Sequence, residues 1–277
     1  MQKFFYILMV KGESSENVIS LEDYAFDDQY EGCEKAMEIK AEKLLAQERE
    51  MNSKFSEVWE KAEGKWENMT TNKNEKDRLF EIDVTAYTME ESKIYPTFNE
   101  AVKKCCKSME AYMNNFHFKA LHFYLTRAIQ ILRRSCTNVY RGITLRHHPN
   151  RTREMRFGQF ASSSLEEDTA RKLTNASGTL YNVYTCEGAN ITHLSVYSNE
   201  TEVLIPPYEV FSVSRFSDSG GLKNVELHST GKFSKFNCTY LEVLHNNAAV
   251  PGQLTTILFP GVLTLVLQTH FQTLTGL

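Results

Sequence analysis

The spacing of apolar residues changes once along this chain, near residue 135. Before that point apolar residues recur at steps of three and four, which is typical of amphipathic helices. After it come short alternating or continuously apolar segments, which predict β-strands. This order predicts an α+β fold, with an N-terminal helical part followed by a meandering sheet region.

The predicted elements follow this pattern. We expect helices over residues 31–65, 98–109 and 116–134. The predicted strands begin at residues 139–142 and continue with residues 155–161, 180–186, 191–197, 203–205, 210–215 and 235–243.

Two segments depart from this order. Residues 80–88 alternate between apolar and polar side chains, which predicts a strand or strand-like turn inside the helical half. Residues 165–173 keep helical spacing inside the β half. We expect Ser164 to cap this helix, with Glu167 three residues on as its capping-box partner.

The composition bounds the class of protein. With 277 residues, 42% of them hydrophobic, the chain can bury one sizeable core. A net charge of −4 favours neither a nucleic-acid partner nor an anionic membrane surface. The sequence has no Cys-x-x-Cys pair and no His/Cys cluster with zinc spacing, so we expect no metal.

Cysteines and glycosylation sequons indicate the compartment. The six cysteines are an even number, as in a disulfide framework. Six Asn-x-Ser/Thr sequons begin at Asn68, Asn150, Asn175, Asn190, Asn199 and Asn237. Together they favour the secretory route, where disulfides and N-glycans form.

The two ends of the chain resemble targeting segments. Residues 4–10 form an apolar run that is short for a signal peptide, so we interpret residues 1–22 as an N-terminal segment with an incomplete signal. Residues 246–277 begin with small and polar residues and continue as an apolar tail whose only ionisable side chain is His270. This pattern resembles a signal for a glycolipid (GPI) anchor, and a membrane-spanning tail is the alternative. The remaining residues, 23–245, are expected to form one domain.

Two carboxylates precede a continuously apolar strand. Glu200 and Glu202 lie one residue apart, before the apolar residues 203–205 and the pair Pro206-Pro207. In an extended backbone, side chains two positions apart point to the same side. Glu200 and Glu202 therefore form either a solvated strand end or a paired-carboxylate site for chemistry that builds positive charge.

Two further residues complete a pattern with these acids. Arg141 ends a predicted strand in residues 140–142, and Ser162 ends another in residues 157–164. With the Glu-x-Glu that ends at Glu202, they resemble the Arg–Ser–ExE signature of vertebrate cell-surface, arginine-specific mono-ADP-ribosyltransferases. Further segments similar to that family are residues 86–88, 121–123 and 185–189.

The resemblance covers residues 23–244 and implies both a fold and an activity. The implied fold has a mainly antiparallel, two-sheet β core after the helices. The implied enzyme transfers ADP-ribose from NAD+ to arginine side chains of target proteins and releases nicotinamide, with NADP+ as a possible alternative to NAD+. It would be a disulfide-bonded glycoprotein, GPI-anchored at the extracellular face of the plasma membrane or secreted. The alternatives are an NAD+ glycohydrolase and a cell-surface recognition protein with a decayed site.

The resemblance also implies a division of roles. Glu202 would stabilise an oxocarbenium-like ribose and hydrogen-bond a ribose hydroxyl. Arg141 would bind the phosphate and ribose side of the dinucleotide, and Ser162 would hold Glu202 in place. Glu200 would bind and orient the acceptor arginine and assist removal of its proton.

Other residues are implied less directly. Tyr87, Gln159 and Ser195 fall where the family's dinucleotide contacts lie. Tyr181 would either stack on nicotinamide or belong to the core. The sequon at Asn199 lies beside the acids, where a glycan would crowd the acceptor, so we expect it to be unused or to restrict substrates.

The resemblance implies two disulfides, Cys33–Cys238 and Cys136–Cys186. Cys105 and Cys106 are adjacent in the chain, and either a vicinal bond or two free thiols is compatible with the sequence.

Overall fold

The computed structural model of the chain describes residues 17–18, 20–68, 75–89, 94–106, 108–149, 153–196, 201–218 and 220–248. The helices are α1 (Glu34–Met51), α2 (Ser53–Asn68), α3 (Arg78–Thr88), α4 (Ile94–Lys104), α5 (Met109–Asn115), α6 (Lys119–Leu132), α7 (Glu167–Lys172) and α8 (Thr239–Ala248). The strands are β1 (Asn17–Val18), β2 (Thr137–Ile143), β3 (His147–His148), β4 (Glu154–Met155), β5 (Ala161–Ser164), β6 (Thr179–Thr185), β7 (Ala189–Asn190), β8 (Glu202–Ile205), β9 (Glu209–Asp218) and β10 (Lys223–Lys232).

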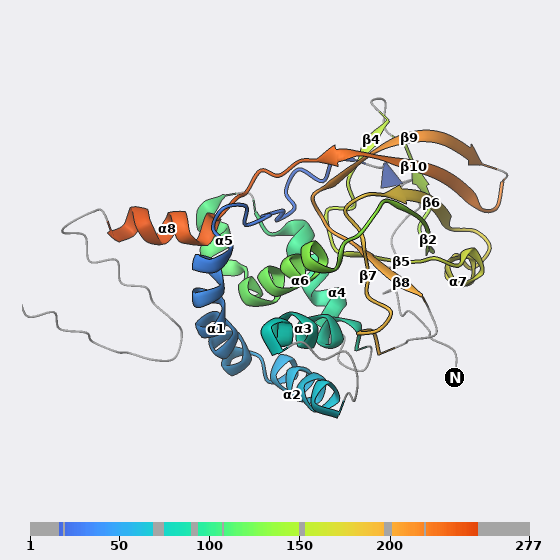
Figure 1. Cartoon of the computed structure of the whole chain (residues 1–277). Helices are drawn as coiled ribbons and strands as arrows, with labels where there is room; N and C mark the ends of the chain where they lie inside the picture. The colour runs from blue at the N-terminus through green and yellow to red at the C-terminus, as the bar shows by residue number, and fades with distance from the viewer. Residues whose placement is uncertain are drawn as a thin grey trace, which may run out of the picture.

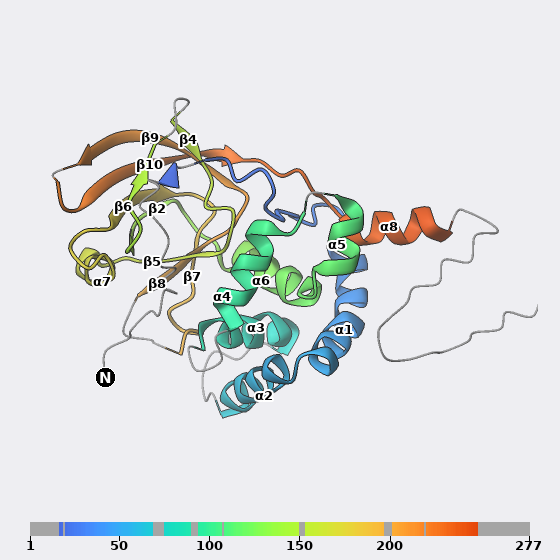
Figure 2. The same cartoon turned by 180° about the vertical axis from the view of Figure 1, so that it is seen from behind.

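Helices and strands lie on opposite sides of the molecule. Helices α1 to α6 pack together on one side, while the long strands and α7 lie on the other (Figures 1 and 2). Helix α8 extends outward from the helical side. The predicted α+β fold, helices first and sheet second, is confirmed.

Polar side chains divide two of the predicted helices. The Asn52 side chain accepts the backbone N–H of Phe55 at 3.1 Å, so a second helix starts where the first one ends. The hydroxyl of Ser108 likewise accepts the N–H of Ala111 at 3.1 Å and starts α5. The predicted helix over residues 31–65 therefore corresponds to α1 with α2. The one over residues 98–109 corresponds to α4 and reaches only the first residue of α5, which the sequence interpretation did not include as a helix.

The predicted strand over residues 80–88 is wrong, because this segment is the helix α3. Every residue from Phe80 to Thr88 is buried. A helix that is buried on all sides has no solvated face, so its apolar residues show no helical period. Here they alternate by chance with the buried polar residues Glu81, Asp83 and Thr85.

Among the described residues, eight strands form one sheet in the order β4-β9-β10-β6-β2-β5-β8-β7. All neighbours pair antiparallel except β10 and β6. Strands β2 and β5 share a single pair, Tyr140 with Ser164, so the sheet narrows there into two parts. Strands β1 and β3 form a separate parallel pair. The mainly antiparallel core is thus confirmed, but the two large sheets expected are joined at that one residue pair.

Three further predicted strands are wrong. Only the two ends of residues 155–161 lie in strands, because β4 ends at Met155 and β5 begins at Ala161. In the strand predicted over residues 191–197, the N–H groups of Leu194 and Ser195 both donate to the carbonyl oxygen of Ile191, at 2.9 and 2.8 Å, so the chain turns there. The segment predicted as a strand over residues 235–243 starts α8 instead. The helix starts there because the Asp28 carboxylate accepts the N–H groups of Cys238 and Thr239 at 2.9 Å each.

The predicted capping box before α7 is also wrong. The residue that precedes this helix is Glu166, which makes no capping side-chain bond. Ser164 ends strand β5, and its hydroxyl accepts the Glu166 N–H at 3.0 Å. The serine therefore stabilises the turn between strand and helix rather than the helix end.

Two apolar cores meet at strand β8. The core of the helical side includes Leu204, and the core of the sheet side includes Val203 and Ile205. Since side chains alternate along a strand, Glu202 points to the same side as Leu204, toward the helices. The second acid of the predicted pair thus lies where the two halves of the molecule meet.

Three disulfides are formed. Both implied pairs are present, Cys33–Cys238 and Cys136–Cys186. The third joins Cys105 to Cys106, which decides between the two alternatives in favour of the vicinal bond.

The expected targeting segments fall largely outside the described residues. Residues 1–16 and 249–277 lie there, so only the start of the C-terminal segment, at the end of α8, is described. Within the described ranges, the helices are too short or too polar to cross a membrane.

Candidate active site

Arg141 lies in the middle of β2, next to the end of β5. One of its guanidinium nitrogens donates to the carbonyl oxygen of Ser162 at 2.6 Å. The guanidinium also lies over the ring of Phe157, 5.7 Å from its centroid. Burial lowers the pKa of Arg141, and a cation removed from water gains most from an anionic partner.

Glu202 is the first residue of β8 and is only 4% exposed. Its Oε2 accepts a hydrogen bond from the Ser195 hydroxyl at 2.9 Å. Thr201, just before it, has a φ of +46°, in the left-handed region that non-glycine residues seldom adopt. The turn at Ser195 and the backbone turn at Thr201 together hold the carboxylate in one place.

Ser162 lies on β5 opposite Leu204, and Ser164 lies opposite Glu202. The carbonyl oxygen of Ser162 accepts a hydrogen bond from Arg141, while the Glu202 carboxylate accepts one from the Ser195 hydroxyl. Ser162 therefore links the arginine to the strand beside the acid. One hollow brings the three predicted residues together; its lining comprises Tyr140, Arg141, Gly142, Ser162, Ser163, Ser164, Thr169, Ala170, Leu173 and Glu202.

Tyr87 lies on α3, is 2% exposed and supports the loop before β5. Its hydroxyl donates to the carbonyl oxygen of Phe160 at 3.0 Å and accepts from the Asn99 amide at 2.9 Å. Asn99 also accepts the Phe160 N–H at 3.1 Å, so the two side chains fix this backbone from both sides. Burial raises the pKa of Tyr87, which keeps its hydroxyl neutral. The half-buried Gln159 directly precedes Phe160 in this loop.

The sequence interpretation did not include Asn99 or Phe157. Asn99 is a buried amide on the apolar face of α4, and such a residue needs hydrogen-bond partners. A polar residue at an apolar helical position was therefore the available signal. Phe157 carried no such signal, because an aromatic residue in a β-rich segment is ordinary.

Glu200 and Asn199 lie outside the described residues. The expected pairing of Glu200 with Glu202 and the expected restriction by a glycan at Asn199 remain predictions.

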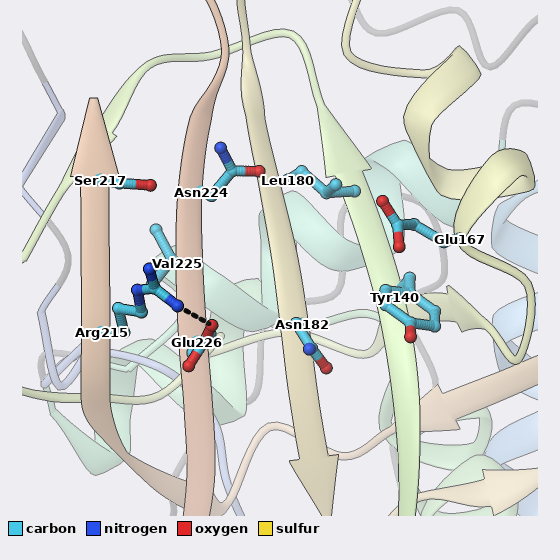
Figure 3. A pocket seen from close by; sticks show the side chains of 9 residues that line it. All are labelled: Tyr140, Glu167, Leu180, Asn182, Arg215, Ser217, Asn224, Val225 and Glu226. Atoms are coloured by element: carbon cyan, nitrogen blue, oxygen red, sulfur yellow. Dashed lines mark ion pairs between the residues drawn. The ribbon is translucent and has the colours of Figure 1, made fainter. Parts of the chain in front are cut away.

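A larger hollow, of about 270 Å³, also has Tyr140 in its lining (Figure 3). The side chains that line it stand on β2, β6, β9, β10 and α7, and Arg215 pairs with Glu226 there at 3.6 Å. Tyr140 and Asn182, which line it, alternate along their strands with Arg141 and Tyr181, so the two sets point to opposite faces. Its size therefore does not make this hollow the site of Arg141 and Glu202.

In the described part of the chain, no three His, Cys, Asp or Glu side chains gather where they could hold a metal ion.

Comparison with known proteins gives one consistent result. The family described as NAD:arginine ADP-ribosyltransferase matches residues 19–235. Ecto-ADP-ribosyltransferase 5 of Homo sapiens is 42% identical over 247 residues, which cover 83% of this chain and 84% of the relative. The Rattus norvegicus protein of the same name is 43% identical over 237 residues, covering 80% and 76%. A crystal structure of a variant of the mono-ADP-ribosyltransferase ART2.2 in complex with NAD has a TM-score of 0.72 and 35% identity, covering 81% of this chain and 99% of that one. The chain belongs to the NAD:arginine ADP-ribosyltransferase family.

Proposed function

We propose that the hollow lined by Arg141, Ser162 and Glu202 is where this ADP-ribosyltransferase binds NAD+ and releases nicotinamide. The observation that carries the proposal is the placement of Glu202. Its carboxylate is buried and is fixed by Ser195 at 2.9 Å, and Glu202 lines one hollow together with Arg141 and Ser162. A fixed charge away from water stabilises a developing opposite charge without first having to reorient.

The chemistry builds positive charge on the sugar. The bond from ribose C1′ to the nicotinamide nitrogen breaks, and its electron pair leaves with nicotinamide, which becomes neutral. The ribose is then oxocarbenium-like, and Glu202 is the carboxylate assigned to stabilise it. A new bond forms between C1′ and a guanidinium nitrogen of the acceptor arginine, which loses a proton.

Arg141 is assigned to the anionic side of the dinucleotide. One of its nitrogens is occupied by the Ser162 carbonyl oxygen, and a guanidinium has further donors in a planar fork suited to phosphate. Ser162 thus acts through the arginine as well as through the strand beside Glu202.

Three more residues are proposed to serve the dinucleotide. Gln159 and Ser195 come from two different loops, and Ser195 would share its hydroxyl between Glu202 and the substrate. Tyr87 is buried and bonded to Phe160, so its part in NAD+ binding is to hold the loop that carries Gln159.

Glu200 is proposed to select the acceptor. A free arginine side chain stays protonated and is a poor nucleophile. A carboxylate two residues before Glu202 would bind the guanidinium, orient one nitrogen toward C1′ and assist loss of its proton. Arginine-bearing proteins are therefore the proposed acceptors.

The site of action is proposed to be the extracellular face of the plasma membrane. Curated relatives carry the name ecto-ADP-ribosyltransferase. The six cysteines form three disulfides, which persist in oxidising compartments. We assign residues 246–277 to a lipid-anchor signal, and release of the protein from intact cells by a phosphatidylinositol-specific phospholipase tests this assignment. Protein that stays on the cells after the treatment would contradict it.

Incubation of the purified protein with labelled NAD+ and agmatine, a small arginine analogue, tests the activity. ADP-ribosyl-agmatine and nicotinamide are the expected products. Free ADP-ribose as the only ribosyl product would instead indicate a glycohydrolase, and no turnover at all would indicate a decayed site.

A further inference from the structure

Two side chains without an assigned role, the buried Tyr181 and the half-buried His147, are bonded to each other near Arg141. Tyr181 is paired directly with Arg141 across β6 and β2, so both side chains point to the same face of the sheet. Tyr181 is 1% exposed, and its hydroxyl is hydrogen-bonded to Nδ1 of His147. A ring placed in this way belongs to the protein interior.

The ring of Phe157 connects this pair to the arginine. It meets Tyr181 edge-on, with ring centroids 5.7 Å apart and an interplanar angle of 82°. The Arg141 guanidinium lies over the Phe157 ring, 5.7 Å from its centroid. Phe211 packs against the same ring, with the two ring centroids 5.6 Å apart. The orientation of the Phe157 ring therefore depends on Tyr181 and determines the surface under the guanidinium.

His147 is itself held by the first residue of β6. Its backbone N–H donates to the Thr179 hydroxyl at 3.0 Å, and that hydroxyl donates to the carbonyl oxygen of Leu145 at 2.8 Å. Burial lowers the pKa of His147 to about 4, and the charges of Lys103, Arg141, Lys223 and His148 act in the same direction. At neutral pH the imidazole is thus uncharged, and one of its nitrogens can accept the tyrosine O–H.

We propose that Tyr181 and His147 are positioning residues for NAD+: by fixing the ring of Phe157 they hold the Arg141 guanidinium in the orientation that binds the anionic part of the dinucleotide. This inference rests on the proposed role of Arg141. It adds a support that the Arg–Ser–Glu pattern does not contain, because it reaches the arginine from β6 and from the segment that follows β2.

A positioning role makes a specific kinetic prediction. If the support acts on binding of the dinucleotide alone, its loss raises KM for NAD+ and leaves kcat nearly unchanged. The affected interaction is one hydrogen bond, so we expect KM to rise by about three- to tenfold. Damage to folding would lower the amount of active enzyme and the thermal midpoint instead.

The experiment uses the full chain and conservative variants. Tyr181→Phe removes only the hydroxyl, and His147→Ala removes its partner. Tyr184→Phe is the matched control, because Tyr184 lies on the same strand, is 36% exposed and packs on His228 rather than on the site. We expect Tyr181→Phe and His147→Ala to raise KM for NAD+ to the same extent, and the double variant to add nothing further. His147→Asn, whose amide can replace Nδ1 as a hydrogen-bond partner, is expected to restore most of the lost affinity.

Arg141→Lys separates this inference from the proposed site. If it raises KM for NAD+ while Tyr181→Phe and His147→Ala do not, the site stands and the positioning role is wrong. If Arg141→Lys leaves KM unchanged, the assignment of Arg141 itself fails. A fall in kcat or in thermal midpoint without a change in KM, in Tyr181→Phe, would also overturn the positioning role.

Discussion

At the scale of single residues, the proposed site depends on which group holds the carboxylate of Glu202. The family pattern implies that Ser162 supports Glu202, yet the hydroxyl bonded to that carboxylate is that of Ser195 at 2.9 Å. Ser162 instead offers its backbone carbonyl to Arg141 at 2.6 Å. The serine of the pattern thus acts in the structure as the link between the arginine and the acid strand.

Glu202→Gln tests the charge without removing the hydrogen-bond acceptor for Ser195. We expect it to lower kcat for both arginine transfer and NAD+ hydrolysis by about 10²- to 10³-fold, because both need the same stabilised ribose. KM for NAD+ and the thermal midpoint should change little. Steady-state kinetics with agmatine and with water as acceptors measure both rates, and unaltered rates would remove Glu202 from the reaction.

Glu200→Gln tests the division of labour between the two acids. We expect transfer to arginine to fall at least tenfold, since a general base contributes about 10² or more, while NAD+ hydrolysis is retained. The ratio of ADP-ribosyl-agmatine to free ADP-ribose, measured in one reaction, reports this directly. An equal fall of both products would show that Glu200 serves NAD+ rather than the acceptor.

At the scale of elements, α3 shows how a buried helix carries polar residues into the core. Asp83 lies in its middle and is fully buried, and no hydrogen bond reaches either carboxylate oxygen from the described part of the chain. Burial raises the pKa of Asp83 well above its usual range, so the protonated acid is favoured in the folded state. The same helix carries Tyr87, which means that its stability bears on the loop before β5.

The pH dependence of stability follows from this shift. The unfolded chain loses the Asp83 proton at about pH 3.9, well before the folded chain does. The free energy of unfolding should therefore fall as the pH rises from about 4 through the folded-state pKa, by up to about 1.4 kcal/mol per pH unit.

Asp83→Asn has no proton to lose and should reduce this slope by the part that Asp83 contributes, leaving the part from other buried acids such as Glu48, whose pKa burial raises to about 8. We expect the variant to be more stable than the wild type at pH 7.5 and nearly equal to it at pH 4. Urea unfolding at several pH values measures the difference. Asp168→Asn, an exposed acid on α7, is the control and should keep the slope. An unchanged slope in Asp83→Asn would place the titrating group elsewhere.

At the scale of the whole molecule, the segment over residues 20–31 joins the two halves. Residues 25–30 are all buried. Asp27 forms an ion pair with Arg156 in which both side chains are fully buried, and Asp28 holds the start of α8. Cys33 then bonds Cys238 across 205 positions of the chain. This segment is therefore held to the sheet side by the ion pair with Arg156, and to the start of α8 by hydrogen bonds and, through Cys33, by a disulfide.

The long disulfide should contribute much more to stability than the vicinal one. Closing a long loop restricts the unfolded chain strongly, so Cys33→Ala/Cys238→Ala should lower the free energy of unfolding by about 2–5 kcal/mol. Cys105→Ala/Cys106→Ala opens a link between neighbouring residues and should lower it by roughly 1 kcal/mol or less by the same reasoning. Denaturant unfolding of both double variants decides the comparison, and equal losses would contradict the loop-length argument.

The sequence by itself determined the order of helices and strands and the residue types of the site. Helices α1 and α2 have one solvated face, and that face leaves a period of three to four in the sequence. The acids, arginine and serine are each ordinary when taken singly, and it was their combination, through its resemblance to the Arg–Ser–ExE signature, that indicated the site.

Only the tertiary structure decided where these groups make their contacts. Helix α3 lacks a solvated face, so its periodicity is hidden, and the turn after Ile191 depends on hydrogen bonds that spacing does not reveal. Spacing likewise does not reveal the hydrogen bond from Ser195 to Glu202 or the pairing of Tyr181 with Arg141 across β6 and β2. The physical reason is that periodicity reports contact with solvent along one element, whereas a hydrogen-bond partner is fixed by how separate elements pack together.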